Sequence, residues 1–341
     1  MNVVQDTADL VPHRSATALA WWLLLALASG ALIGVCVGID GLHWLGADDP
    51  FVITAIRLPR VIGAILTGAL LGLAGALAQG LFRNPLADPY LLGSASGATL
   101  ALVVMIALTT GVSISDTPAF ALVLKLGFTG AAFAGAMGGV ALTLILARGA
   151  HHATNLLLAG VIIGILLGTI ANLITLSFPE SLRTVQGFLY GSTSLLSWSA
   201  CAVEAVGLGI TLSAALRFSR VLDALVLGES TAESLGVEIH RTRLMLILLM
   251  ALATGCAVAQ TGLVAFVGLI SPHLVRRHVD TTHQGILLLA ALTGAVLLLW
   301  ADTLSRWWLA PSELPVGLFT AILGGGYLLW LLYRQERGEL A

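Results

Sequence analysis

Charge is what this sequence has least of. Only 10% of its 341 residues are Asp, Glu, Lys or Arg, whereas soluble globular domains carry about 25%. Apolar residues make up 58%, and 38 glycines add to them. A soluble core has no room for so much apolar surface, so the composition predicts a chain that crosses a membrane several times.

Lysine is almost absent as well, because Lys125 is the single example. A phosphate-binding P-loop needs a lysine after a glycine-bracketed turn. Lys125 instead follows the apolar run Phe-Ala-Leu-Val-Leu. We therefore expect no ATP hydrolysis and no enzyme activity from this chain. If its action is driven by ATP, the ATPase is another polypeptide.

Cysteine is also scarce. Cys36, Cys201 and Cys256 lie in apolar stretches and show no paired spacing. They are interpreted as small buried residues rather than disulfides or metal ligands, and we expect no bound metal and no cofactor. The formal net charge is −2 and the cations are scattered singly, so the sequence does not predict a nucleic-acid partner.

Long uncharged runs fill most of the chain. About 20 apolar residues suffice for a helix to cross a bilayer. The run from 244 to 274 is too long for one helix, and we divide it at Gln260, Thr261 and Gly262. The sequence thus predicts an all-α polytopic membrane protein, one transmembrane domain over 1–341. Its ten expected spans are 16–38, 61–82, 90–110, 126–147, 155–176, 192–216, 243–260, 263–279, 284–302 and 315–333.

The distribution of cations predicts the orientation of these spans. An even number of spans puts both termini on one side. If the N-terminus is inside, eleven of the sixteen Lys and Arg residues fall in inner positions and five in outer ones. Because cytoplasmic loops carry an excess of these residues, we expect both termini to be cytoplasmic.

Glycines recur at close to helical spacing in two of the expected spans. Small residues of this kind let the backbones of membrane helices approach closely. We expect helix packing from two sets, which are Gly68, Gly72 and Gly75 in the second span and Gly135, Gly138 and Gly139 in the fourth.

The largest inner loop, about 217–243, contains a short amphipathic segment. Ser230 is a suitable N-cap with Glu233 at the capping-box offset, and Gly236 ends the helix. Ala232 and Leu235 are three residues apart and are expected to share an apolar face. Such a helix suits either insertion into a groove of another protein or an ordinary solvated connection. The residues alone leave both open.

Three arginines stand on the outer side, against the general charge bias. Arg57 and Arg60 share a face at the outer end of the second span, and Arg306 lies at the outer end of the ninth. They either snorkel into lipid headgroups or pair with carboxylates of a protein that docks from outside. Glu204 and Asp302 are interpreted as aqueous or paired surface groups rather than as proton sites.

Several of these segments, taken in order, resemble one known family. The matching stretches are RLPR at 57–60, NPLADP at 84–89, LLGSASGA at 91–98, the residues Gly228, Glu229, Ala232, Leu235 and Gly236, the stretch 262–273 followed by Arg276, and Asp302, Arg306 and 313–317. Together they resemble the FecCD family, permease subunits of ATP-driven importers for iron–siderophore complexes, haem and cobalamin. The similarity covers nearly all of the chain after about Val52.

The resemblance implies a permease of type II ABC importer architecture in the bacterial inner membrane. It implies a homodimer with two ABC ATPase subunits beneath it and a periplasmic substrate-binding protein above it. The implied roles are ATPase coupling for Gly228, Glu229, Ala232, Leu235 and Gly236, binding-protein docking for Arg57, Arg60 and Arg306, and a cytoplasmic gate at Asn84, Leu86, Thr154 and Asn155.

The implied cargo is a metal chelate, first an iron chelate (siderophore or haem) and second cobalamin, and no residue separates these. In physical terms Asn84 can cap the turn that follows the second span, and Leu86 can plug an apolar constriction. Thr154 and Asn155 stand where family members often have Thr-Ser, so the match is weaker there. The alternative functions are an ion-gradient-driven secondary transporter and a purely structural membrane subunit.

Overall fold

The computed structural model describes residues 15–38, 41–42, 50–109, 118–147, 149, 153–308, 310 and 312–339. Strands β1 (Val37–Gly38) and β2 (Gly41–Leu42) form a short antiparallel pair. The other regular elements are helices: α1 (Ala16–Cys36), α2 (Pro50–Val52), η1 (Ile53–Arg57), α3 (Leu58–Phe82), η2 (Pro89–Leu92), α4 (Ser94–Thr109), α5 (Pro118–Leu146), α6 (Ala153–Ser177), η3 (Pro179–Ser181), α7 (Leu182–Tyr190), α8 (Trp198–Arg217), α9 (Ser219–Val226), α10 (Glu229–Ser234), α11 (Ile239–Thr261), α12 (Val267–His278), α13 (His283–Trp308) and α14 (Val316–Glu339).

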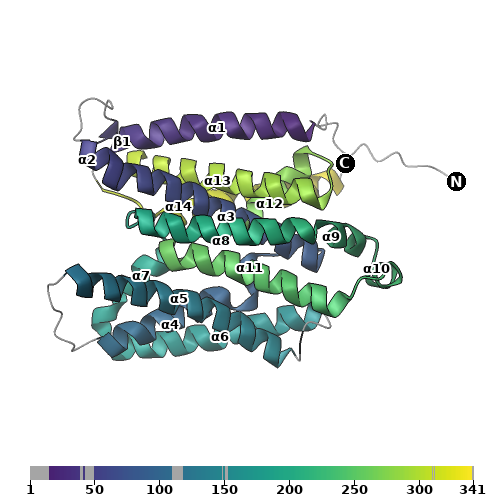
Figure 1. The fold of residues 1–341 in the computed structure, drawn as a ribbon, viewed down its shortest axis with the longest axis horizontal. Coiled ribbons are helices and arrows are strands. Elements are labelled where there is room, and N and C mark those ends of the chain that lie inside the picture. The colour runs from purple at the N-terminus through teal and green to yellow at the C-terminus, as the bar shows by residue number, and fades with distance from the viewer. Residues whose placement is uncertain are drawn as a thin grey trace.

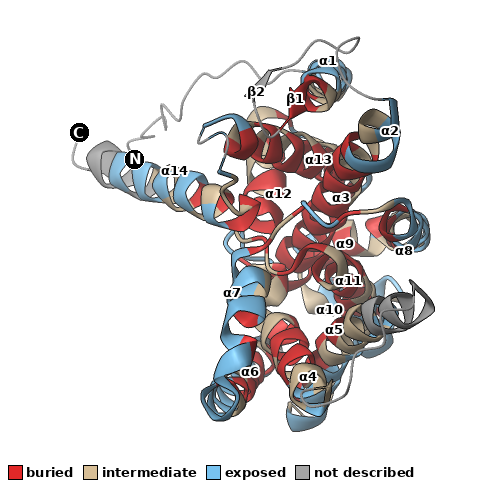
Figure 2. Ribbon diagram, turned by 90° about the vertical axis from the view of Figure 1, so that its left-hand side faces the viewer, coloured by how far each residue is buried: buried red, intermediate tan, exposed pale blue. Residues whose placement is uncertain are grey.

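The long helices lie side by side along one axis of the molecule (Figure 1). α9 and α10 lie at one end of this bundle, where α1 begins, and α2 and α7 lie at the other. We call these the α10 end and the α7 end. Viewed along the bundle, buried residues gather in α3, α12 and α13, whereas α14 projects to one side and α6 and α7 are largely exposed (Figure 2).

The predicted all-α membrane fold is confirmed. Seven stretches of the described chain are long and apolar enough to cross a membrane, namely α1, the continuous stretch Pro50–Phe82, the Leu126–Leu146 part of α5, α6, α8, α11 and α13. α4 and α14 supply shorter apolar segments. Together with α12, these helices each overlap one of the ten expected spans. The predicted division of the 244–274 run is also confirmed, because α11 ends at Thr261 and Gly262 has a φ of +72°.

Some predicted boundaries are wrong. The second span begins at Pro50 rather than at 61, because Arg57 and Arg60 are buried inside the protein instead of marking the edge of the bilayer. α12 has 12 residues, a rise of roughly 18 Å, which is too short to span a bilayer alone. The sixth span begins at Trp198 rather than 192. Residues 192–197 form a non-helical connection instead, and the amide of Ser192 donates to the carbonyl of Thr261.

Two helices were not predicted. α7 carries Arg183 and buries only Val185, so no long uncharged run marks it. α9 opens the inner loop and buries Leu222 and Leu225 against the bundle. Both helices are short and amphipathic, and a search for uncharged runs passes over such segments.

α3 is the most buried of the long helices and packs backbone to backbone with its neighbours. A Cβ atom at Gly68 would overlap the carbonyl oxygen of Gly294 in α13, and one at Gly72 would also overlap α13. A Cβ at Gly75 would overlap the carbonyl oxygen of Gly268 in α12. The predicted packing role of these α3 glycines is confirmed. It allows α3 to sit between α12 and α13 with almost no exposed residue.

Close contact between glycine and a backbone carbonyl also joins α4 and α5. Gly135 lies against the carbonyl oxygen of Gly97, and Gly139 lies against that of Gly93. Gly138, however, is exposed and has nothing within 4 Å of its Cβ position, so it packs no other helix within the described part of this chain.

Gly75 and Gly138 therefore form a matched pair for a stability test. We expect Gly75→Ala to destabilise the protein by about 1–3 kcal/mol, because overpacking forces backbone shifts. Gly138→Ala is expected to be neutral or slightly stabilising, because alanine is the better helix former. Thermal denaturation of the two purified variants in one detergent measures the difference. Equal melting temperatures for both variants would show that the contact between α3 and α12 is not as close as described.

Candidate functional site

At the α7 end, Arg60 sits at the centre of a group of charged side chains. Its Nε and Nη2 atoms donate to Asp302 Oδ1 at 3.1 and 3.0 Å, and its Nη1 donates to both carboxylate oxygens of Glu313 at 2.9 Å. Arg306 Nη2 lies 3.1 Å from Asp302 Oδ2. The Thr193 hydroxyl also donates to Asp302. We call these five residues the Arg60 cluster.

The Arg60 cluster ties α3 and α13 to the loops before α8 and α14, and backbone carbonyls extend it to α1. Arg306 Nη1 donates to the carbonyls of Gly34 at 3.0 Å and Val37 at 2.6 Å. Arg57 donates in the same way to the carbonyl of Val35 at 3.0 Å. Charges within a membrane protein are expensive unless paired, so this closed set of contacts explains why the sequence tolerates them here.

The three outer arginines are therefore buried, whereas docking groups are expected to be exposed. Arg57, Arg60 and Arg306 are only 7%, 8% and 3% exposed, and each has contacts within the chain. Docking by these residues stays a prediction, and it requires a partner's carboxylates to join or replace the internal ones. Glu313 is the most exposed member of the Arg60 cluster, with 27% of its side chain accessible.

The expectation for the two acidic residues is corrected. Asp302 is indeed paired, but it is fully buried rather than at the surface. Glu204 in α8 is fully buried too, and its Oε1 accepts a hydrogen bond from the Thr67 hydroxyl of α3 at 2.5 Å. Sequence reasoning placed both near helix ends, and their burial follows from neighbouring helices that no single-span pattern reveals.

At the α10 end, α3 leads into the polar turn that contains Asn84. The Asn84 Oδ1 atom accepts from the amide of Leu86 at 2.9 Å, so its predicted capping of this turn is confirmed. Asp88 Oδ1 accepts from the amide of Tyr90 at 2.7 Å and starts η2. Desolvation raises the pKa of the Asp88 carboxyl, and the hydrogen bond from Tyr90 opposes that rise.

The four residues expected to form a gate are all exposed in the single chain. Asn84 and Leu86 lie in the turn after α3, and the Leu86 side chain is 52% exposed. Thr154 and Asn155 lie in the first turn of α6. α6 packs against η2, the short helix that follows the turn containing Asn84 and Leu86. Their role as a gate stays a prediction.

The predicted helix in the inner loop exists as α10, but its start differs. The N-cap is Gly228, with a φ of +109°, so the proposed capping by Ser230 is wrong. Its end agrees with the prediction, because Gly236 has a φ of +85° and the amide of Val237 bonds to the carbonyl of Ala232. The N-cap position has a positive φ, which glycine adopts readily and which a serine at that position would adopt only with strain.

The two apolar residues of this helix face opposite ways. Ala232 is fully buried against the bundle, whereas Leu235 is 65% exposed. The predicted shared face is therefore wrong. Val226 and Leu227, which are 60% and 66% exposed, are further exposed apolar residues just before α10.

Glu229 connects α10 to two other parts of the chain. Its Oε1 accepts from Arg243 Nη2 in α11 at 2.8 Å and from Arg83 Nη2 in the turn after α3 at 3.3 Å. Arg243 is 3% exposed, while Arg83 is 44% exposed, so the first ion pair is the stronger one. Sequence reasoning named Glu229 but missed both arginine partners, which lie 14 and 146 residues away.

Residues 18–334 match the model of the FecCD transport family. The chain belongs to this family. It is 41% identical over 318 residues to the hemin transport system permease protein HmuU of Yersinia pestis, covering 92% of this chain and 93% of that protein. It is 35% identical to the vitamin B12 import system permease protein BtuC of Vibrio cholerae, covering 97% of this chain and 99% of that protein.

A solved structure of an inward-facing metal-chelate-type ABC transporter has a TM-score of 0.81 and 29% sequence identity, and the match covers 94% of this chain and 99% of that one. This FecCD chain is thus a multi-pass membrane protein and a permease of the metal-chelate class of ABC importers. Proteins of this class are not enzymes themselves.

The burial of the Arg60 cluster leads to a stability prediction. Asp302→Asn leaves two buried arginines with too little opposing charge, which typically costs about 3–5 kcal/mol. Glu313→Gln removes a partly exposed carboxylate from the same arginine and is expected to cost much less. Thermal denaturation of both variants in detergent compares them. Asp302→Asn melting at the wild-type temperature would contradict the described pairing.

Proposed function

We propose that this chain is the permease subunit of a binding-protein-dependent ABC importer that moves a metal chelate into the cytoplasm. It works as one transmembrane domain in a homodimer, with both termini and α10 in the cytoplasm. Two ABC ATPase subunits bind at the α10 end, and a periplasmic substrate-binding protein docks at the α7 end. The membrane is the bacterial inner membrane.

The arrangement around α10 is the observation that carries this proposal. A short helix lies at one end of the bundle, buries Ala232 against its own chain and presents Leu235 outward. An outward apolar side chain on a well-anchored helix suits insertion into a groove on another protein. Gly228, Glu229 and Gly236 shape and anchor the helix, while Leu235 makes the contact with the ATPase.

The same arrangement offers a path for movement. When ATP binding moves the ATPase subunits, α10 moves with them. Glu229 carries that movement through Arg83 into the turn that holds Asn84 and Leu86, and through Arg243 into α11. The turn, together with the start of α6 at Thr154 and Asn155, opens and closes the cytoplasmic end of a pathway between the two copies.

Docking at the other end uses the Arg60 cluster and Arg57. Carboxylates of the binding protein approach Arg57, Arg60 and Arg306 and compete with Glu313, the cluster member with the most accessible side chain. Such charge pairs fix the orientation of the partner and speed its encounter more than they add affinity.

Reconstitution tests the function as a whole. Proteoliposomes that contain the permease and its ATPase are expected to take up haem from an added binding protein only when ATP is present. A ferric siderophore and cobalamin are tested in parallel, because relatives of this chain serve haem and vitamin B12 systems. Uptake by the permease alone along a proton gradient would contradict the proposal and support a secondary transporter.

Coupling is tested at Leu235, the exposed C-cap residue of α10. Leu235→Asp puts a charge on the surface proposed to enter the ATPase, so we expect ATPase association to weaken roughly tenfold or more. The matched control is Leu195→Asp, a 79% exposed leucine before α8. Co-purification of the ATPase with each variant is the measurement. Association that is unchanged in Leu235→Asp, or equally weakened in both variants, would contradict the assignment of α10.

A further inference from the structure

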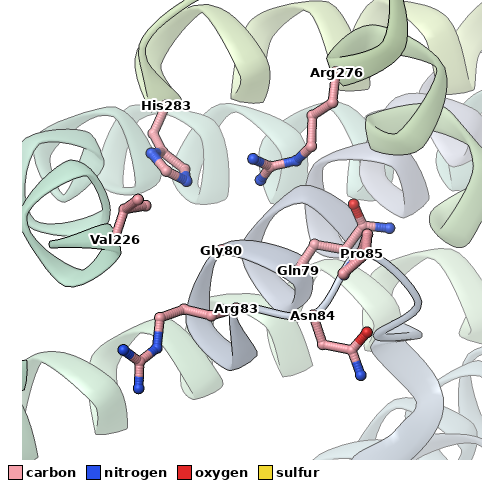
Figure 3. Close-up of a pocket in the computed structure, with 8 residues that line it drawn as sticks. All are labelled: Gln79, Gly80, Arg83, Asn84, Pro85, Val226, Arg276 and His283. Atoms are coloured by element: carbon pink, nitrogen blue, oxygen red, sulfur yellow. The ribbon is translucent and has the colours of Figure 1, made fainter. Parts of the chain in front are cut away.

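A pocket of about 240 Å³ lies at the α10 end, where α3 and α12 end and α13 begins. Arg276 and His283 reach into it from one side, and the last turn of α3 with the following turn forms the other side (Figure 3). Its lining residues are Gln79, Gly80, Arg83, Asn84, Pro85, Val226, Arg276 and His283. None of the roles proposed above for α10 or for the gate uses the two basic residues.

His283 offers one unused nitrogen to this pocket. The residue is 4% exposed, and its Nδ1 lies 2.7 Å from Asp223 Oδ1, which also accepts from the His283 amide. Because a carboxylate accepts there, Nδ1 carries a proton. Nε2 remains, buried and without a hydrogen-bond partner in the described chain.

Gln79 offers a buried acceptor nearby. It is 3% exposed, and its Nε2 donates to the carbonyl of Leu269 at 3.0 Å. That bond leaves Oε1 buried and without a partner among the described residues. The pocket therefore contains at least one unused oxygen acceptor besides the histidine nitrogen.

Arg276 supplies the charge. Its Nε and Nη2 atoms are inaccessible to solvent and have no hydrogen-bond partner in the part of the chain described. Two acids share an adjoining hollow with Arg276: Asp223, which accepts from His283, and Asp280, which is exposed. A guanidinium group left in this state is strongly unfavourable, so an anion is the expected occupant.

We propose that this pocket binds a phosphate-bearing anion that also carries a hydroxyl group. The Arg276 guanidinium, whose Nε and Nη2 lack partners in the described chain, supplies the positive charge that pairs with the phosphate. One of the two acceptors, Gln79 Oε1 or His283 Nε2, accepts from the hydroxyl, which a fully ionised sulfate lacks. Two sources fit this chemistry, namely the phosphoglycerol headgroup of an anionic lipid and free hydrogen phosphate.

The position of the pocket, near residues typical of a membrane–water interface, suits a lipid headgroup. Arg277, next to Arg276, and Arg334 of α14 both lie over the ring of Trp330, with Cζ atoms 5.5 and 5.7 Å from its centroid. Tryptophan and arginine gather in this way at membrane–water interfaces. Basic pockets between membrane helices on the cytoplasmic side are known sites for anionic lipid headgroups.

The test compares Arg276→Gln with Arg241→Gln, a control arginine whose side chain is 75% exposed and has one 3.8 Å contact to Glu238. The purified permease is titrated with phosphatidylglycerol and phosphatidylcholine, with bound lipid counted by native mass spectrometry, and with inorganic phosphate and sulfate by calorimetry. We expect roughly tenfold weaker binding of the phosphate-bearing probe in Arg276→Gln only. Phosphatidylcholine and sulfate should bind weakly to every form.

The two sources are then distinguishable. Arg276-dependent binding of phosphatidylglycerol alone assigns the pocket to lipid, and Arg276-dependent binding of inorganic phosphate assigns it to the free ion. Binding that is the same in both variants overturns the proposal. If Arg276→Gln does not fold, an experimental structure of the wild-type protein in phosphatidylglycerol nanodiscs decides. A phosphate group at Arg276 supports the proposal, and water or an acidic side chain of the ATPase in that place overturns it.

Discussion

The close approach of α3 to α12 and α13 is the constraint on which the rest of this structure depends. In lipid, apolar side chains gain little by leaving one apolar surrounding for another, so helices associate through tight packing and polar contacts. Gly68 and Gly75 bring the backbone of α3 against those of α13 and α12. Larger residues there would separate the helices and remove the contacts that hold the centre of the bundle.

α3 also links the two ends of the molecule. One end of this helix enters the Arg60 cluster, in which the carboxylates of Asp302 and Glu313 pair with Arg60. The other end leads to Arg83, which contacts Glu229 of α10. A rigid, buried helix between a charged cluster and a short surface helix can pass a movement from one end to the other, which is what the proposed coupling to a separate ATPase requires.

Much of this fold could be predicted, because long uncharged runs leave a bilayer-spanning helix as the main option. The signals failed where tertiary contacts override them. Arg57 and Arg60 appeared to end a span, but they are buried in a helix that continues past them. The direction of Ala232 and the partners of Glu229 and Arg60 depend on residues far away in the sequence. No local periodicity shows such contacts.

Hydrogen–deuterium exchange of the purified permease tests the central role of α3 most directly. If α3 is held on all sides by close backbone contact, the amides from Val61 to Phe82 should be among the slowest to exchange in the protein. Those of α14, which projects from the bundle, should exchange much faster (Figure 2). Exchange in α3 as fast as in α14 would contradict the account.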